Sequence, residues 1–139
     1  MPKTFEFRSE VYFDELDALW VLHHSRYLKH LERAQQAFFQ QLLGVLDFNA
    51  ARDEDIYVVV RNLEIDYKQP LRNPGPVLIR YTVSRIRAAG VTMDFAFLSG
   101  DEETLYCAGK RTVCKLSGKT HQPAEWSPAF REALEQWVG

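Results

Sequence analysis

One long helical pattern, in a chain whose other patterned segments alternate, limits the fold more than any other feature of the sequence. From Tyr27 onward apolar residues recur at steps of three and four, which is the period of a helix with one broad apolar side. They are Leu28, Leu31, Ala34, Phe38 and Leu42. Gly44 predicts the C-terminal end of this helix, and Tyr27, Phe39 and Leu43 widen its apolar stripe. We therefore expect the helix to lie deep against a large surface.

Most of the remaining chain predicts strands. Alternating or β-rich stretches cover residues 4–13, 56–70, 77–87, 91–98 and 104–116. Short turns between the later stretches make consecutive strands antiparallel neighbours. A short helix is expected from about Ser127, whose side chain can cap it, to Val138. The predicted class is α+β, with a roughly five-stranded antiparallel sheet against one long helix and a short C-terminal helix.

Length and composition predict one domain over residues 1–139 and exclude several classes of protein. The chain is 46% hydrophobic and 26% charged, which is globular rather than disordered composition. Its net charge of −2 gives no general attraction to nucleic acid or to an anionic membrane. No apolar run approaches the roughly 20 residues of a spanning helix, and the first strand-like stretch lacks the apolar core of a signal peptide. We expect a cytoplasmic protein without nucleic-acid or membrane partners.

The two cysteines predict packing residues rather than redox or metal chemistry. Cys107 and Cys114 share one predicted strand at an odd separation, which points their side chains to opposite faces and prevents a local disulfide. No CxxC pair is present, so neither a structural zinc site nor a thioredoxin-type motif is indicated.

Polar side chains gather where the long helix is expected to begin. The stretch FDELDALWVLHHSRYLKHLE, from Phe13 to Glu32, places three acids, a tryptophan and a pair of histidines ahead of or at the helix start. Capping a helix needs only one short polar side chain, so this density suggests a reaction site. The stretch resembles the signature of hotdog-fold thioesterases of the 4-hydroxybenzoyl-CoA thioesterase type. LEIDYKQPLRNPG, residues 63–75, resembles a strand of that family that ends in a proline-containing turn.

The resemblance implies roles for individual residues. Asp17 matches the catalytic aspartate, His24 the position that opens the helix, Tyr27 the family tyrosine and Glu32 an acid on the helix. It also implies an antiparallel sheet wrapped around one long helix, assembled as a homodimer or a homotetramer. The implied activity is thioester hydrolysis without a cofactor, since coenzyme A is part of the substrate.

The chemistry of a thioester suits these residue types. Hydrolysis needs a base or nucleophile, together with a group that stabilises negative charge on the carbonyl oxygen. The Asp17 carboxylate can activate water or attack directly. Backbone N–H groups at a helix start have no partner within the helix, so the amides near His24 and Ser25 are candidate oxyanion donors.

Each candidate also has an ordinary structural interpretation. Asp17 taken alone is a solvated loop acid, and only the surrounding pattern favours catalysis. The His24 side chain can lack a chemical role even where its amide has one. His23 is expected on the surface or lining the substrate, with Ser25 beside it. Tyr27 is a core residue at this spacing or positions the substrate.

The rest of the stretch is given structural or specificity roles. Glu32 is expected to anchor the Asp17 loop, and Asp14 and Glu15 to be solvated. Trp20 stands where the family usually has glycine, whose backbone conformations a tryptophan does not adopt freely. Trp20 is expected to fill part of the pocket, restrict acyl size or stack on an aromatic acyl group, or to mark a member with weak activity.

Basic residues near the pocket are candidates for binding the phosphates of coenzyme A. Arg87 matches a basic cluster that the family carries between its middle strands, although two alanines follow it here. Lys68 and Arg72, beside a proline turn, are alternatives, and each of the three can be ordinary surface charge. This thin cluster leaves acyl carrier protein open as the thiol carrier. No metal site is expected, because His24 and His30 are not three or four residues apart on the helix.

The sequence thus predicts an acyl-CoA thioesterase and leaves alternatives open. An acyl-acyl-carrier-protein thioesterase would use the same chemistry with a protein partner. A non-catalytic hotdog module that captures an acyl group would tolerate Asp17→Asn, whereas a hydrolase would not. A hydratase of the same fold is disfavoured, because Leu22 stands five residues after Asp17, where that pattern needs histidine.

Overall fold

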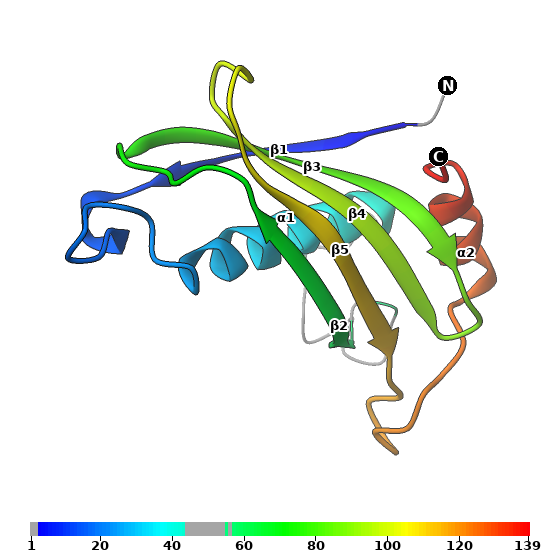
Figure 1. Ribbon diagram of the computed structural model, residues 1–139. Helices are drawn as coiled ribbons and strands as arrows, with labels where there is room; N and C mark the ends of the chain where they lie inside the picture. Colours follow the sequence, from blue (N-terminus) through cyan, green and yellow to red (C-terminus); the bar gives the residue numbers. More distant parts are fainter. Residues whose placement is uncertain (1–2, 44–54, 56) are drawn as a thin grey trace.

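A five-stranded antiparallel sheet, one long helix and a short C-terminal helix make up the fold (Figure 1). A computed structural model describes residues 3–43, 55 and 57–139. The elements in chain order are β1 (Phe5–Val11), the 3-10 helix η1 (Phe13–Glu15), α1 (Arg26–Leu43), β2 (Val58–Tyr67), β3 (Gly75–Ile86), β4 (Gly90–Ser99), β5 (Leu105–Lys115) and α2 (Pro128–Glu135). The sheet order is β1-β3-β4-β5-β2, so the first two strands of the chain form its two edges. The predicted α+β class is confirmed.

Predicted and observed element boundaries differ by a few residues. β1 ends at Val11 because the chain turns into η1, and Phe13, the last residue of the predicted strand, lies in η1 and is 63% exposed. α2 ends at Glu135 rather than at Val138. The predicted end of the long helix at Gly44 lies outside the described residues.

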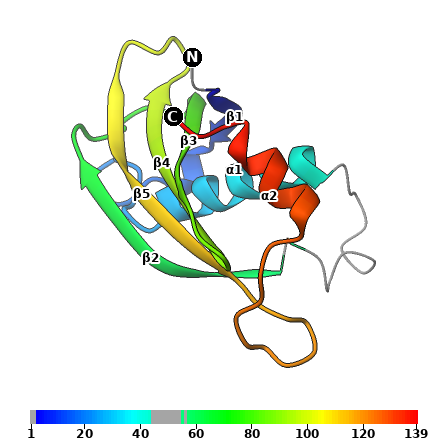
Figure 2. The same ribbon diagram turned by 90° about the vertical axis from the view of Figure 1, so that its right-hand side faces the viewer.

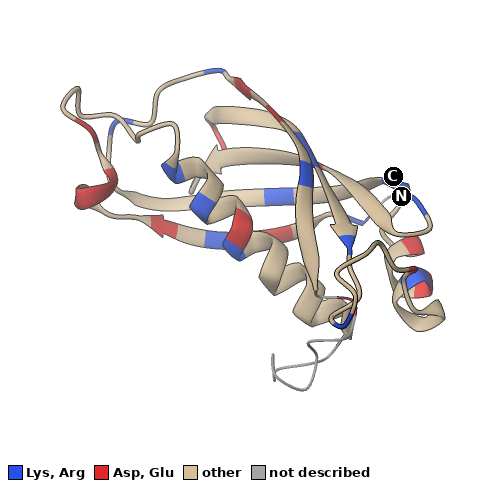
Figure 3. Ribbon diagram, turned by 90° about the horizontal axis from the view of Figure 1, so that it is seen from below, with Lys and Arg blue, Asp and Glu red and all other residues tan. Residues whose placement is uncertain are grey.

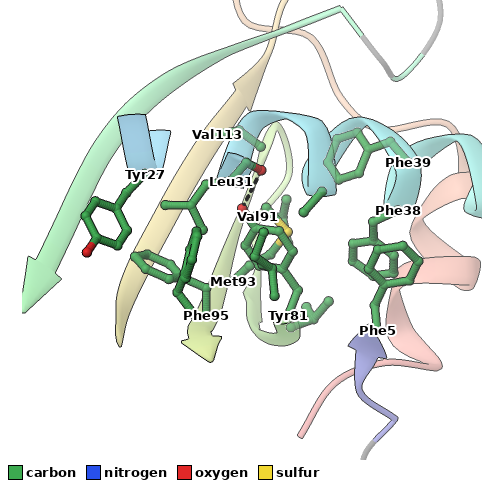
Figure 4. Packing of buried hydrophobic residues seen from close by; sticks show 14 of the residues in the cluster. Phe5, Tyr27, Leu31, Phe38, Phe39, Tyr81, Val91, Met93, Phe95 and Val113 are labelled. Atoms are coloured by element: carbon green, nitrogen blue, oxygen red, sulfur yellow. Dashed lines mark hydrogen bonds between the residues drawn. The ribbon is translucent and has the colours of Figure 1, made fainter. Parts of the chain in front are cut away.

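The sheet curves around α1 (Figure 2). Buried residues from both form the hydrophobic core. The buried residues of α1 are Tyr27, His30, Leu31, Ala34, Gln35, Phe38 and Phe39. Leu28, predicted on the apolar stripe, is 37% exposed, because the buried side of the helix passes through Tyr27 and Leu31 instead. The Tyr81 hydroxyl on β3 donates to the Leu31 carbonyl at 2.9 Å (Figure 4). Further along α1, the Phe38 ring stacks on Phe5 with 4.8 Å between centroids.

All charged residues of α1 lie in its first half (Figure 3). One of them, Glu32, pairs with the guanidinium of Arg111 on β5, and Arg111 also donates to the amide oxygen of Gln35. Arg111 is 2% exposed, and its charge is compensated by these contacts. The prediction that Glu32 anchors the Asp17 loop is therefore wrong, because its side chain faces the sheet. No helix of the described residues is long and apolar enough to cross a membrane.

A buried ion pair between Lys115 and Asp55 links β5 to the start of α2. The Lys115 ammonium lies 2.8 Å from Asp55 and donates to the Glu125 carbonyl at 2.9 Å. Asp55 also accepts from the Ser127 amide at 2.8 Å and from its hydroxyl at 2.7 Å. Burial opposes ionisation of Asp55, but the bonds from Lys115 and Ser127 prevail and lower its pKa. The Ser127 hydroxyl oxygen in turn accepts the Phe130 amide, which confirms the predicted cap.

The two cysteines are unpaired and buried. Burial raises the pKa of the Cys107 thiol to about 12, so the thiol stays protonated at neutral pH. Cys114, on the same strand, is 9% exposed. Both are packing residues, as predicted.

Candidate active site

The Asp17 carboxylate is held by the backbone of its own loop. Its Oδ1 accepts the Leu19 amide at 2.8 Å and the Val21 amide at 3.4 Å. The backbone of Asp17 closes the same loop, accepting the Trp20 amide at 3.0 Å and donating to the Val21 carbonyl at 2.9 Å. Within the part of the chain that the structure describes, Oδ2 has no hydrogen-bond partner. One carboxylate oxygen is therefore oriented and the other is available to water or substrate.

Trp20 adopts the backbone conformation that favours glycine. Its φ is 61°, in the left-handed region, where the Cβ of any other residue is crowded. The ring is 62% exposed and packs edge-on against Phe13 with 5.3 Å between centroids. The tight turn of the loop therefore strains the backbone at Trp20, and such strain is common at functional sites.

Among the described residues, the start of α1 offers an amide without an acceptor beside this loop. The Arg26 amide donates to the His23 carbonyl at 2.8 Å. His23 Nδ1 accepts the Ser25 amide at 3.2 Å and lies 2.8 Å from the Ser25 hydroxyl. Among the described residues the His24 amide has no acceptor. The His24 amide therefore remains a candidate oxyanion donor, whereas the Ser25 and Arg26 amides are already engaged.

Two depressions flank the helix start and divide the predicted site residues. One of about 290 Å³ is lined by Asp14, Glu15, Leu16, Asp17, His23, Ser25 and Arg26. The other, of about 270 Å³, is lined by Val21, Leu22, His24, Tyr27, Tyr67, Lys68, Gln69 and Pro70. Asp17, His23 and Ser25 thus share one depression, and His24 and Tyr27 share the other. Trp20 lines neither, so its role in specificity stays a prediction.

Tyr67 is a site residue that the sequence analysis missed. At the end of β2, its hydroxyl donates to the His24 carbonyl at 3.1 Å. Its ring packs edge-on against Tyr27, with 5.3 Å between centroids. Burial raises the pKa of Tyr27 to about 12, so this phenol stays protonated. The alternation of β2 carried a usable signal, because Tyr67 shares its parity with Ile65, which packs against the core.

Glu15 and His30 were also missed. The two side chains lie 2.8 Å apart, and the other ring nitrogen of His30 lies 2.6 Å from the Ser9 hydroxyl. The prediction that Glu15 is solvated is wrong, since it is only 6% exposed. Asp14, expected to be solvated as well, is exposed. No pattern in the sequence marks this contact, because the three residues come from three separate elements.

Comparison with known proteins decides the family. The model described as the thioesterase-like superfamily matches residues 11–134. The chain belongs to the thioesterase-like superfamily. It is 27% identical to acyl-CoA thioesterase YbgC of Haemophilus influenzae, over 68% of this chain and 68% of that protein. It is 30% identical to acyl-CoA thioesterase YbgC of Helicobacter pylori, over 62% of this chain and 61% of that protein.

Solved structures agree with the family assignment. The 1,4-dihydroxy-2-naphthoyl-CoA thioesterase Slr0204 from Synechocystis superposes with a TM-score of 0.79, covering 95% of this chain and 96% of that one at 14% identity. At this identity the likeness shows the fold, which is the predicted hotdog fold. The resemblance found in the sequence is confirmed, and with it the enzyme class of this thioesterase-like protein, a thioester hydrolase.

The structure does not bring Arg87 near Asp17. The Asp17 loop follows β1, whose last residue Val11 pairs with Gly75 at the start of β3. Arg87 follows the other end of β3, roughly 36 Å further along the strand at about 3.3 Å per residue. There it lines a depression of about 200 Å³ together with Arg61 from β2. Within one chain of this thioesterase-like protein, Arg87 therefore lies at the opposite end of β3 from the Asp17 loop.

Lys68 and Arg72 lie closer to the helix start. Lys68 lines the depression that contains His24, although its ammonium also pairs with Asp66 at 2.5 Å. Both members of this pair are exposed, so the pair is weak, and another anion can replace Asp66 as the partner of Lys68. Arg72 lines neither depression, but it adjoins buried Leu71 beside the loop. These two residues stay candidates for phosphate binding.

Proposed function

We propose that this protein hydrolyses acyl-CoA thioesters to a free acid and coenzyme A, with Asp17 as the general base or nucleophile. One observation carries the proposal. The Asp17 carboxylate has one oxygen fixed by loop amides and the other without a partner among the described residues, in a depression at the start of α1. The YbgC relatives, which are acyl-CoA thioesterases by name, support coenzyme A as the thiol carrier.

Two routes fit this arrangement. As a general base, Asp17 takes a proton from water while that water attacks the thioester carbonyl; the C–S bond then breaks and the proton passes to the leaving thiolate. As a nucleophile, the carboxylate attacks first, expelling coenzyme A and forming a mixed anhydride that water hydrolyses. In both routes the His24 amide stabilises the oxyanion. Each such donor contributes about 3–4 kcal/mol to lowering the barrier.

The test is thiol release from short-chain, long-chain and aromatic acyl-CoAs. Native protein is compared with Asp17→Asn and with Asp94→Asn, which removes one charge from an exposed pair with Lys110 on the sheet. We expect Asp17→Asn to lower kcat roughly 100-fold or more and Asp94→Asn to stay near native. Native rates for Asp17→Asn would exclude it as the catalyst. Turnover of acyl carrier protein substrates, but not of acyl-CoAs, would make acyl carrier protein the thiol carrier. Binding of acyl-CoA without turnover would favour the non-catalytic module.

We also propose that the protein forms a homodimer through the free edge of β2. Among the residues that the structure describes, this ten-residue strand pairs only with β5, and its other edge has backbone groups without a strand partner. Val59 and Val60 on it are 46% and 45% exposed. Light scattering after gel filtration should give the mass of two chains, and Val60→Lys should shift it toward one. A native monomer would refute the proposal, and a mass of four chains would indicate pairing of dimers through a further surface.

A further inference from the structure

Three polar side chains form a buried hydrogen-bonded chain beside the start of α1. Ser9 comes from β1, His30 from α1 and Glu15 from η1. His30 Nδ1 lies 2.6 Å from the Ser9 hydroxyl, and His30 Nε2 lies 2.8 Å from Glu15 Oε1. His30 has no exposed surface and Glu15 retains 6%. Groups this deeply buried need their hydrogen bonds, so the chain holds the three elements in one arrangement.

Glu15 extends this chain into the loop that carries Asp17. Its Oε2 accepts the Tyr12 amide at 2.8 Å, before the loop. Its backbone carbonyl accepts the His23 amide at 3.4 Å, on the far side of the loop. Asp17 lies between these two attachments and only two residues after Glu15. The position of the Asp17 carboxylate relative to the helix start therefore depends on where Glu15 is fixed.

The protonation of the pair is consistent with a fixed geometry. Burial lowers the pKa of His30; Glu15 acts against this, while Lys29 and Arg33 on α1 lower it further. Burial disfavours the charged form of Glu15, but its bonds to a backbone amide and to His30 leave its pKa below the usual value. At neutral pH a neutral His30 therefore faces a carboxylate. It must donate from Nε2 to Glu15 and accept at Nδ1 from the Ser9 hydroxyl.

The order serine, histidine, carboxylate is also that of a hydrolase triad. Ser9, however, lines neither depression at the helix start. Glu15 lines the depression of Asp17, but both of its carboxylate oxygens are engaged by His30 and the Tyr12 amide. The geometry therefore suits a support for the loop better than a second nucleophile.

We propose that Glu15 and His30 are positioning residues which, through their hydrogen-bonded chain to Ser9, hold the Asp17 loop against the start of α1. The inference rests on the proposed function of Asp17, because positioning matters only if that carboxylate reacts. Loss of the chain should displace Asp17 while leaving the His24 side of the site in place. Turnover should therefore fall more than substrate binding.

The test compares His30→Phe, which fills the space but removes both bonds, with His30→Gln, which can still donate to Glu15. Ser127→Ala is the control, because it breaks a buried polar contact at the start of α2, in an element that carries none of the loop. Readouts are kcat and KM on the best acyl-CoA, the melting temperature, and amide exchange of Leu19 and Val21. If His30→Phe does not fold, Glu15→Gln replaces it, since an amide cannot accept through both of its terminal atoms.

Support requires five results together. His30→Phe should lower kcat roughly tenfold or more, as misplaced catalytic groups do, with KM little changed. It should also speed exchange of both loop amides, and His30→Gln should restore much of each property. Ser127→Ala should lower the melting temperature without either effect. In an Asp17→Asn background, His30→Phe should cause no further loss of kcat, since residues acting as one unit are not additive.

Other outcomes separate the two proposals. Unchanged exchange of Leu19 and Val21 in a folded His30→Phe variant would overturn the positioning role, whatever the activity. Equal losses of kcat in His30→Phe and Ser127→Ala would reduce the chain to general stability and overturn it too. If native protein cleaves no acyl-CoA, the proposed function fails, while the exchange rates still decide whether the chain holds the loop.

Discussion

The left-handed conformation of Trp20 makes a sharp prediction about stability. With φ at 61°, any residue with a Cβ is strained by about 1–2 kcal/mol, whereas glycine is not. Glycine loses about 0.5–1 kcal/mol through its greater freedom in the unfolded chain. At this position glycine should therefore be more stable than alanine by about 1 kcal/mol. This reverses the ordinary preference for alanine.

The tryptophan ring offsets part of the strain. Its edge-on contact with Phe13 is worth about 0.5–1.5 kcal/mol. Trp20→Ala keeps the strain and loses this contact, so it should destabilise the protein by about 1 kcal/mol. Trp20→Gly loses the contact but also the strain, and should stay within about 0.5 kcal/mol of the native protein. The expected order of stability is native and Trp20→Gly together, with Trp20→Ala below both.

Urea unfolding and thermal melts followed by circular dichroism test this order. A difference of 1 kcal/mol corresponds to roughly 3–4 °C in Tm for a domain of this size. Ala18→Gly serves as the control, because Ala18 is exposed in the same loop without a positive φ. There glycine should be the less stable residue, by about 0.5–1 kcal/mol. If Trp20→Ala proves as stable as Trp20→Gly, the left-handed conformation is not what limits this position.

Three further predictions concern the rest of the fold. A Cβ at Gly109 would lie 1.8 Å from the Glu64 carbonyl oxygen, so Gly109→Ala should separate β2 from β5. In urea unfolding the substitution should cost about 3 kcal/mol. A near-native unfolding midpoint would contradict the close approach of the two strands. Lys115→Met leaves the Asp55 carboxylate buried without its cation and should cost about 3 kcal/mol by the same measurement. The lowered pKa values of Asp55 and Glu15 mean that their ionised forms stabilise the fold fully above pH 4.5 and lose this contribution as the pH falls through the folded values. Tm should accordingly drop on acidification below that point, and a flat profile down to pH 3 would show that the pKa values are not lowered.

Periodicity was sufficient to predict the elements, because it reports which residues face the core. The steps of three and four after Tyr27 and the alternation in the later strands correspond to α1 and to β3, β4 and β5. The prediction from periodicity failed on α1, where a polar residue is buried. Leu28 was placed on the apolar stripe because it is apolar, yet it is 37% exposed, while polar His30 is fully buried. A pattern of residue types cannot register a histidine whose burial depends on a carboxylate from another element.

The site was predictable only where it is local in sequence. Asp17 and the helix start lie within ten residues of each other, and their loop hydrogen bonds follow from short-range geometry. Contacts between residues on different elements could not be predicted from short-range geometry. Glu32 was expected to anchor the loop by hydrogen bonds, but its carboxylate pairs with Arg111 on β5. Tyr67, which reaches the His24 carbonyl, is likewise more than forty residues away along the chain.

The two halves of α1 stabilise the site through different kinds of contact. The second half is uncharged and packs its aromatic rings against the sheet and α2, with Phe38 between Phe5 and Trp137. The first half carries the charged residues and His30, whose partners lie on β1 and η1. Because a helix is stiff along its axis, anchoring by the apolar half fixes where the first turn begins. The buried polar contacts then fix the loop relative to that turn, so substitutions of Phe38 should change stability, and those of His30 should change the placement of Asp17.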